Sequence, residues 1–143
     1  MSDLTIERRS VSADAAQALV AAAAEHTRKS GGAVAIVVCD MDGATKASLR
    51  MDGASHFSIA LAEDKAYTAA TFGVPTDQWF DLIKGDGPLL HGVPTTPRFS
   101  VIGGGYPLKL AGQVVGAIAV SGGAPPDDVE CARSAAAAAG FEV

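Results

Sequence analysis

The residues in this chain that could bind a ligand begin with a run of three glycines, Gly103, Gly104 and Gly105, between two apolar segments. Glycine has no Cβ, so its backbone adopts positive φ angles and a ligand can pack directly on the peptide planes. Successive N–H groups in such a turn form a nest that binds anions. Arg98 and Tyr106 flank the run, and these donors suit a carboxylate. The alternative is a tight connection between two strands that binds nothing.

Lys65 is a second candidate, because it lies in the middle of a predicted helix among small apolar residues. Either its amine extends to solvent or pairs with Glu63, Asp64 or another acid, or it points into a pocket. Burial in a pocket would lower its pKa and make it an acid, a base or an anchor for an anion. Asp64 is itself a candidate ligand contact, or it caps a neighbouring loop.

The histidines are His26, His56 and His91, and no two have the H-x-x-x-H spacing of zinc ligands. His26 lies late in a predicted helix, where a positive imidazole complements the helix dipole. His56 precedes the central predicted helix and His91 lies in a Gly/Pro-rich loop. Each is a candidate iron ligand or general base, or an ordinary polar loop residue. Phe57, beside His56, either forms the wall of an apolar pocket or belongs to the core.

Length and composition limit the possible classes of protein. The 143 residues suit an arm over 1–10 and a single domain over 11–143. Hydrophobic residues make up 48% of the chain, which argues against disorder, and a net charge of −5 argues against a nucleic-acid partner. The sequence shows no signal peptide and no apolar run of about 18 residues, so we expect no membrane partner. We therefore expect a cytoplasmic protein in which Cys39 and Cys131 stay reduced.

The first half of the chain predicts two helices around a hairpin, followed by a shorter helix. Ser12 is the expected N-cap of a helix that ends near residue 30. Strands are predicted over 33–39 and 45–51, joined by a turn at Asp42-Gly43. A helix over 55–73 ends at Gly73, and Thr76 is the expected N-cap of a shorter helix that ends at residue 85.

The second half predicts a long ordered loop over 85–97, three strands over 98–102, 106–110 and 113–122, and a closing helix over 124–140. Consecutive hairpins favour antiparallel pairing. The central strands show no polar side, so helices should cover both faces. The prediction is an α/β (α+β) fold: a three-layer α/β/α sandwich around a five-stranded, mainly antiparallel sheet.

Four segments of the sequence form a recognisable set of motifs: Asp64-Lys65-Ala66-x-Thr68-Ala69, Phe72-Gly73-x-Pro75-Thr76, the three glycines, and Gly116-x-Ile118-x-Val120-Ser121-Gly122-Gly123. These motifs resemble those of the GlcG/HbpS-like haem-binding family, which also includes the C-terminal domain of PduO-type corrinoid adenosyltransferases. The resemblance covers roughly residues 11–140. It implies a profilin-like α/β/α sandwich with a five-stranded sheet, assembly into compact oligomers and, in several members, haem binding.

We expect a homo-oligomer that binds haem or a related tetrapyrrole in an apolar pocket, with the three glycines facing the ligand and His56 or His91 on the iron. The alternative is a cofactor-independent small-molecule enzyme: an isomerase, hydratase or lyase. In it, Lys65 or a loop histidine would move a proton and the glycine N–H groups would stabilise an oxyanion. A third possibility is a subunit that only oligomerises.

Overall fold

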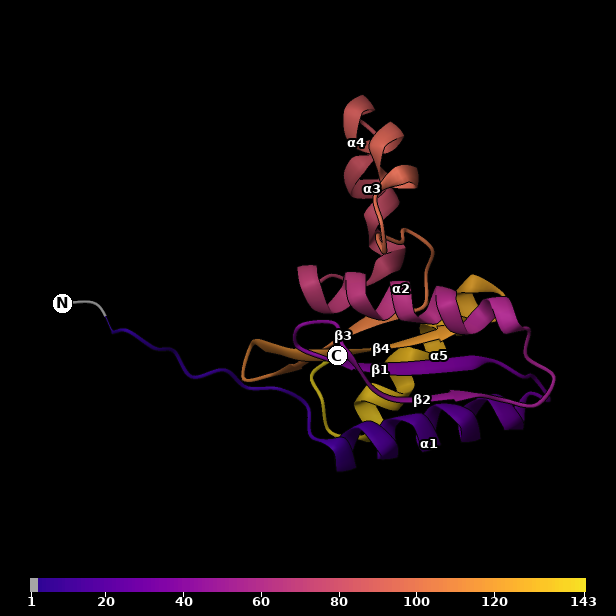
Figure 1. Ribbon diagram of the computed structural model, residues 1–143. Helices are drawn as coiled ribbons and strands as arrows, with labels where there is room; N and C mark the ends of the chain where they lie inside the picture. The colour runs from indigo at the N-terminus through magenta and orange to yellow at the C-terminus, as the bar shows by residue number, and fades with distance from the viewer. Residues whose placement is uncertain (1–2) are drawn as a thin grey trace.

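The computed structural model describes residues 3–143 (Figure 1). Residues 1 and 2 of the expected arm lie outside the described residues. The elements follow in the order α1 (Ala13–Lys29), β1 (Ala35–Asp40), β2 (Thr45–Arg50), α2 (His56–Phe72), η1 (Thr76–Gln78), α3 (Trp79–Ile83), α4 (Gly87–Gly92), η2 (Val93–Thr95), β3 (Gly105–Leu110), β4 (Gln113–Ser121) and α5 (Pro125–Ala138).

The described strands form one antiparallel sheet in the order β2-β1-β4-β3. The centre of the sheet is the pair β1 and β4, where Val37 lies opposite Ala119. On its other side Val37 lies opposite Ser48 of β2. The predicted antiparallel pairing is therefore confirmed.

The predicted strand over 98–102 is wrong, and so is the five-stranded sheet: residues 3–143 contain four strands in the sheet. The segment turns at Arg98, whose φ is 64°. Backbone groups of this segment then hydrogen-bond to a side chain of α2 instead of to a neighbouring strand. The Thr68 hydroxyl lies 3.0 Å from Arg98 O and accepts a hydrogen bond from Ser100 N at 2.9 Å. Because these contacts come from tertiary structure, local β propensity could not reveal them.

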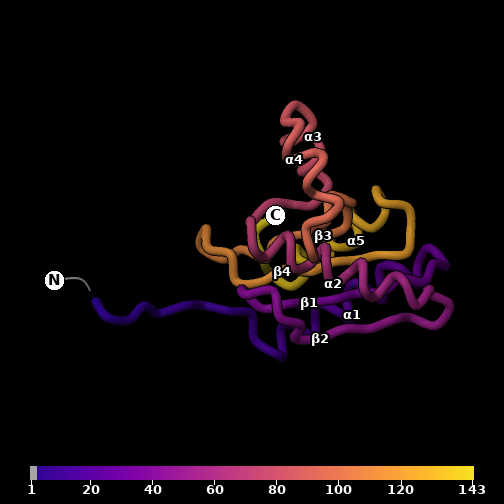
Figure 2. Tube along the Cα trace, turned by 45° about the horizontal axis from the view of Figure 1, so that its top comes forward, coloured from indigo at the N-terminus to yellow at the C-terminus, as the bar shows by residue number. Residues whose placement is uncertain are grey.

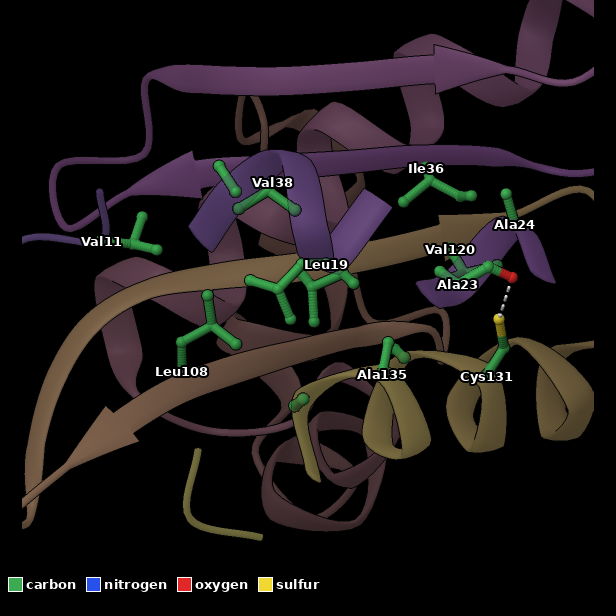
Figure 3. Packing of buried hydrophobic residues seen from close by; sticks show 14 of the residues in the cluster. Val11, Leu19, Ala23, Ala24, Ile36, Val38, Leu108, Val120, Cys131 and Ala135 are labelled. Atoms are coloured by element: carbon green, nitrogen blue, oxygen red, sulfur yellow. Dashed lines mark hydrogen bonds between the residues drawn. The ribbon is translucent and has the colours of Figure 1, made fainter. Parts of the chain in front are cut away.

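Helices cover both faces of the sheet, as predicted, and give three layers (Figure 1). Successive β1 residues point to opposite faces. Val37 and Cys39 pack against α2, whereas Ile36 and Val38 pack against α1 and α5. Figure 3 shows the second of these clusters, in which Leu19 of α1 lies between the sheet and α5. Burial on both faces explains the continuous apolar run in the sequence.

Small side chains bring α2 close to the sheet. Its buried face carries alanines at 62, 66, 69 and 70, and these pack against Ala117 and Ala119 of β4. The helix ends at Gly73 in the left-handed conformation, with φ of 69°, as predicted. The close approach places the middle of α2, including Lys65, directly over β4.

Residues 76–97, here called the lobe, project from the body as η1, α3, α4 and η2 (Figures 1 and 2). The predicted long loop over 85–97 is therefore wrong: it contains α4, whose first turn is capped by the Asp86 side chain accepting from Leu89 N. Rings of Phe72, Trp79 and Phe99 pack at the base of the lobe, with centroids 5.0–5.4 Å apart.

Thr76 does not cap the short helix after α2, as had been predicted. The N-cap of η1 is Pro75, and its side chain makes no capping bond. The Thr76 hydroxyl instead accepts a hydrogen bond from Gly105 N at 2.9 Å. It therefore joins the base of the lobe to the three-glycine segment.

The two cysteines are free and lie on opposite sides of the sheet. Cys39 faces α2, and Cys131 of α5 faces α1. Burial raises the pKa of the Cys39 thiol to about 12. The sheet between them prevents a disulfide within one chain. Among the helices of residues 3–143, none combines the length and the apolar character needed to cross a bilayer.

Candidate functional site

A hollow of about 270 Å³ opens between the start of α2 and the turn that joins β4 to α5; we call it the α2 hollow. The α2 side contributes apolar and hydroxyl side chains together with a lysine. The opposite side contributes glycine backbone and a carboxylate. The lining residues are Ser55, Phe57, Ser58, Leu61, Lys65, Ile102, Ser121, Gly122, Gly123, Pro125 and Asp128.

The floor of the α2 hollow is an ion pair between Lys65 and Asp128, and both residues are at most 2% exposed. Lys65 Nζ donates to Val120 O at 3.0 Å and lies 3.7 Å from Asp128 Oδ2. Asp128 Oδ1 accepts from Gly123 N at 3.1 Å. Lys65 therefore does not extend to solvent: it pairs with another acid, one of the alternatives open in the sequence, and from that buried position it also lines the α2 hollow. The pair joins α2 to the first turn of α5 across the end of β4.

Burial and pairing act on this ion pair in opposite directions. Burial lowers the pKa of the Lys65 amine, and the nearby Asp128 charge opposes that change. Burial raises the pKa of the Asp128 carboxyl, and Lys65 opposes it. Each charge therefore favours the ionised form of the other in surroundings that favour neither. The floor of the hollow is polar and is connected to main-chain groups.

The rim of the α2 hollow is apolar and accessible. Phe57 is 72% exposed and Ile102 is 44% exposed, although both are large hydrophobic residues. His56, the first residue of α2, lies beside Phe57 and is also exposed.

The three glycines lie behind this floor, and protein atoms occupy the space in front of each of them. A Cβ on Gly104 would meet Val120 O and lie 2.8 Å from Lys65 Nζ. A Cβ on Gly105 would lie 2.5 Å from Lys65 O and 2.7 Å from Thr76 Cγ2. At Gly103 it would lie 2.9 Å from a side chain of α5. Packing around Lys65 therefore accounts for Gly104 and Gly105, and packing against α5 and η1 accounts for Gly103. The expected contact of the three glycines with a ligand stays a prediction.

Asp64 and Arg98 form a separate group on the outer side of α2. Asp64 Oδ1 lies 4.0 Å from Arg98 Nε. The Arg98 guanidinium lies 3.9 Å from the centroid of the Tyr67 ring, and it donates to Gly43 O at 3.3 Å. Neither residue lines the α2 hollow. This geometry fits the alternative role for Asp64, which was to hold a neighbouring loop.

The remaining predicted site residues are dispersed. Tyr106 of β3 packs against the cluster under α1 and α5, on the face of the sheet opposite α2. His91 belongs to α4 in the lobe, and His26 belongs to α1. Of the predicted set, only Phe57 and Lys65 line the hollow, with His56 next to them. In the described part of the chain, no group of three or more histidine, cysteine, aspartate or glutamate residues is placed to hold a metal ion.

Asp128, the partner of Lys65, is not among the site residues predicted from the sequence. Asp128 lies in the first turn of α5, where an acidic residue is already explained by the helix dipole. Only the fold brings it to a lysine 63 positions earlier in the chain. The pair Gly122-Gly123 was a usable signal, because both residues line the α2 hollow and Gly123 N binds the Asp128 carboxylate.

A family model described as "Haem degrading protein HbpS-like" matches residues 11–137. Among curated protein sequences, none matches the chain significantly.

Solved structures similar to this chain include Klebsiella pneumoniae protein ORFY, with 28% identity, a TM-score of 0.91 and coverage of 97% of each chain. A structure of HbpS is 31% identical, with a TM-score of 0.87 and coverage of 94% of each chain. A PduOC–haem complex is 28% identical, with a TM-score of 0.83 and coverage of 93% of this chain and 97% of that one.

Proposed function

This chain belongs to the HbpS-like family, and from that premise we propose that it binds haem or a related tetrapyrrole at the α2 hollow. The observation that carries the proposal is the hollow itself, which has exposed apolar side chains at its rim and a buried ion pair at its floor. The PduOC structure that resembles this chain is described as a complex with haem.

The size of the α2 hollow limits how a tetrapyrrole could lie in it. Its volume, about 270 Å³, lies just below the roughly 300–1,000 Å³ typical of ligand pockets. The hollow can therefore take one edge of the macrocycle, while the rest lies against Phe57 and Ile102. The outer edge would remain open to solvent or be covered by a second copy of the chain.

His56 is the residue we propose as the iron ligand. It is exposed at the start of α2, and the hydrogen bonds within residues 3–143 include none from its imidazole. A neutral imidazole nitrogen is a common axial ligand of haem iron. Bound haem would supply the redox chemistry of its iron. The chain would supply the ligand, the apolar contact surface and the polar floor.

The alternative proposal, a cofactor-independent enzyme based on Lys65, gains no support from the comparisons. The Lys65 amine is buried and is already engaged by Val120 O and Asp128. We therefore assign Lys65 and Asp128 a structural role beneath the ligand.

Titration of the purified protein with haemin should produce a saturable Soret shift. His56→Ala should remove the shift or weaken binding by a factor of about 10 or more, because loss of even an outer partner of a metal ligand costs about that much. His91→Ala is the matched control, since His91 lies in the lobe and not at the hollow. It should titrate like the unmodified protein.

Two results would contradict this assignment. An unchanged titration in His56→Ala would exclude His56 as the iron ligand. A protein that gives no saturable shift at all would exclude haem as the ligand.

We also propose that the protein is a homo-oligomer. Large apolar side chains on or beside the lobe remain about half exposed or more: Phe72, Phe80, Leu82 and Leu89. Soluble monomers rarely leave such side chains clustered at the surface.

The cytoplasm remains our proposed compartment, supported by two buried thiols that cannot pair within one chain.

A further inference from the structure

We propose that residues 3–7 of one chain add to the free edge of β2 in a second copy, as an extra strand of its sheet. The proposal rests on the homo-oligomer proposed above and is independent of haem. It is carried by two separate features of the structure, namely an extended N-terminal arm and an open groove along β2.

Residues 3–10, here called the arm, lie outside every helix and strand, and the chain bends at Leu4 (Figures 1 and 2). Leu4 is fully exposed and Ile6 is 81% exposed. In an extended strand both residues would lie on one side, and the polar residues Asp3, Thr5 and Glu7 would lie on the other. This alternation is typical of a strand with one buried face. Within the described chain, the backbone groups of residues 3–9 have no hydrogen-bond partners.

The base of the arm is fixed, so its direction is set by the fold. Arg8 Nη2 donates to Asp42 Oδ1 at 2.6 Å. The Ser10 hydroxyl accepts from Met41 N at 3.2 Å, and Val11 N donates to Val115 O at 2.8 Å. From this base the arm leads away from its own body, as Figure 1 shows. The apolar residues at 4 and 6 therefore have nothing to pack against in their own chain.

The receiving surface is the outer edge of β2, which is an end strand of the sheet among the described residues. A groove of about 550 Å³ runs between this edge and α1. Alanine and other apolar side chains supply much of its lining, with basic residues near both ends. The lining residues are Ala13, Gln17, Val20, Ala21, Ala24, Arg28, Lys46, Ala47, Ser48 and Leu49.

The arm and the groove are complementary in shape, polarity and charge. Ala47 and Leu49 of β2 face the core, as Leu4 and Ile6 of an added strand would. An antiparallel arm with Thr5 opposite Ser48 would place Leu4 opposite Leu49, Ile6 opposite Ala47, Asp3 opposite Arg50 and Glu7 opposite Lys46. Opposite charges directly across a pair of strands are stabilising.

The same charges select among the possible occupants of this edge. Lys46 and Arg50 would repel each other if two β2 edges paired, because like charges across strands are destabilising. The acidic residues of the arm remove that repulsion. Pairing of the arm with β2 of its own chain would require the arm to reverse direction next to Arg8, which is held by Asp42. The arm can pair with β2 of a second copy without reversing its direction.

The mass of the protein in solution, measured by light scattering after size exclusion, tests the proposal. The unmodified chain should be an oligomer, and Leu4→Asp/Ile6→Asp should reduce its mass by at least half. Both residues are exposed, so the substitution leaves the folded monomer intact. Val143→Asp is the matched control, because Val143 is an apolar residue with 62% exposure at the other terminus. An arm variant that keeps the full mass would overturn the proposal, and so would a monomeric parent chain.

A disulfide between Thr5→Cys and Ser48→Cys tests the position of the arm. Oxidation of the double variant should join two chains, giving a covalent dimer or larger ladder on a non-reducing gel. The native cysteines are buried and do not interfere. A disulfide only within one chain would show that the arm folds back on its own β2, and no disulfide would show that the arm lies elsewhere. Either result refutes the proposal, whatever the haemin titration gives.

Discussion

Asp128→Asn is expected to destabilise the fold by about 3–5 kcal/mol, the usual cost of removing one partner of a buried ion pair. The amide retains an oxygen that can accept from Gly123 N, so the substitution removes mainly the charge. Lys65 Nζ would keep its bond to Val120 O but lose its only nearby anion among the described residues. Urea unfolding, with circular dichroism as the readout, measures the loss.

The pH dependence identifies charge as the cause. Burial lowers the pKa of Lys65 in the folded state. In Asp128→Asn the unpaired Lys65 therefore reduces the stability of the fold at every pH at which its amine is protonated in the unfolded chain. The deficit of Asp128→Asn should therefore shrink as the pH rises from 7 towards about 10, the pKa of an unfolded lysine. Burial raises the pKa of Asp128, so the deficit of Lys65→Met should shrink as the pH falls towards about 4.

The double variant Lys65→Met/Asp128→Asn is the control for this cycle. It buries no charge, so it should recover most of the stability lost in either single variant. Additive losses with no opposite pH trends would show that the two residues do not act as an ion pair.

Gly105→Ala is expected to reduce stability by about 3 kcal/mol or more, because the added methyl group meets a backbone that cannot move without shifting α2. The new Cβ would lie 2.5 Å from Lys65 O and 2.7 Å from Thr76 Cγ2. The hydrogen bond from Gly105 N to Thr76 Oγ1 would be strained as well. The midpoint of urea unfolding should fall, with the slope unchanged.

Gly85→Ala is the matched control for this substitution. A Cβ at Gly85 meets nothing within 4 Å, and its φ lies outside the left-handed region. Its midpoint should stay within experimental error of the unmodified protein. If Gly105→Ala unfolds at the same midpoint as Gly85→Ala, then the three glycines are not needed for packing around Lys65.

The sequence alone predicted those parts of the fold that depend on local chemistry. The Ser12 hydroxyl accepts from Ala15 N and caps α1, as predicted. Gly73 ends α2, and the hairpin turns at Gly43 with a φ of 85°. In each case the side chain, or its absence, acts within a few residues of its own position. Such signals can be read from one sequence without knowledge of tertiary contacts.

The wrong predictions concern residues whose hydrogen-bond partners are distant in the sequence. The segment 98–102 has strand-forming residues, but the Thr68 hydroxyl binds its backbone where a neighbouring strand would be needed. Thr76 fits the pattern of an N-cap, but its hydroxyl binds Gly105 N. In both cases a hydroxyl that could act locally is used across the fold instead.

The candidate site could be predicted only in part, for the same reason. Phe57 and Lys65 were candidate pocket residues in the sequence, and both line the α2 hollow. The three glycines were predicted to face a ligand, but Gly104 and Gly105 pack against Lys65 with no space for a side chain. Asp128 carries no local signal of its role, because its partner lies on another helix.

The position of iron in crystals of the protein grown with haemin tests the central proposal most directly. The anomalous signal of iron should lie beside His56, with the macrocycle against Phe57 and one edge in the α2 hollow. Iron located at the lobe, or on the face of the sheet covered by α1 and α5, would contradict the proposed site.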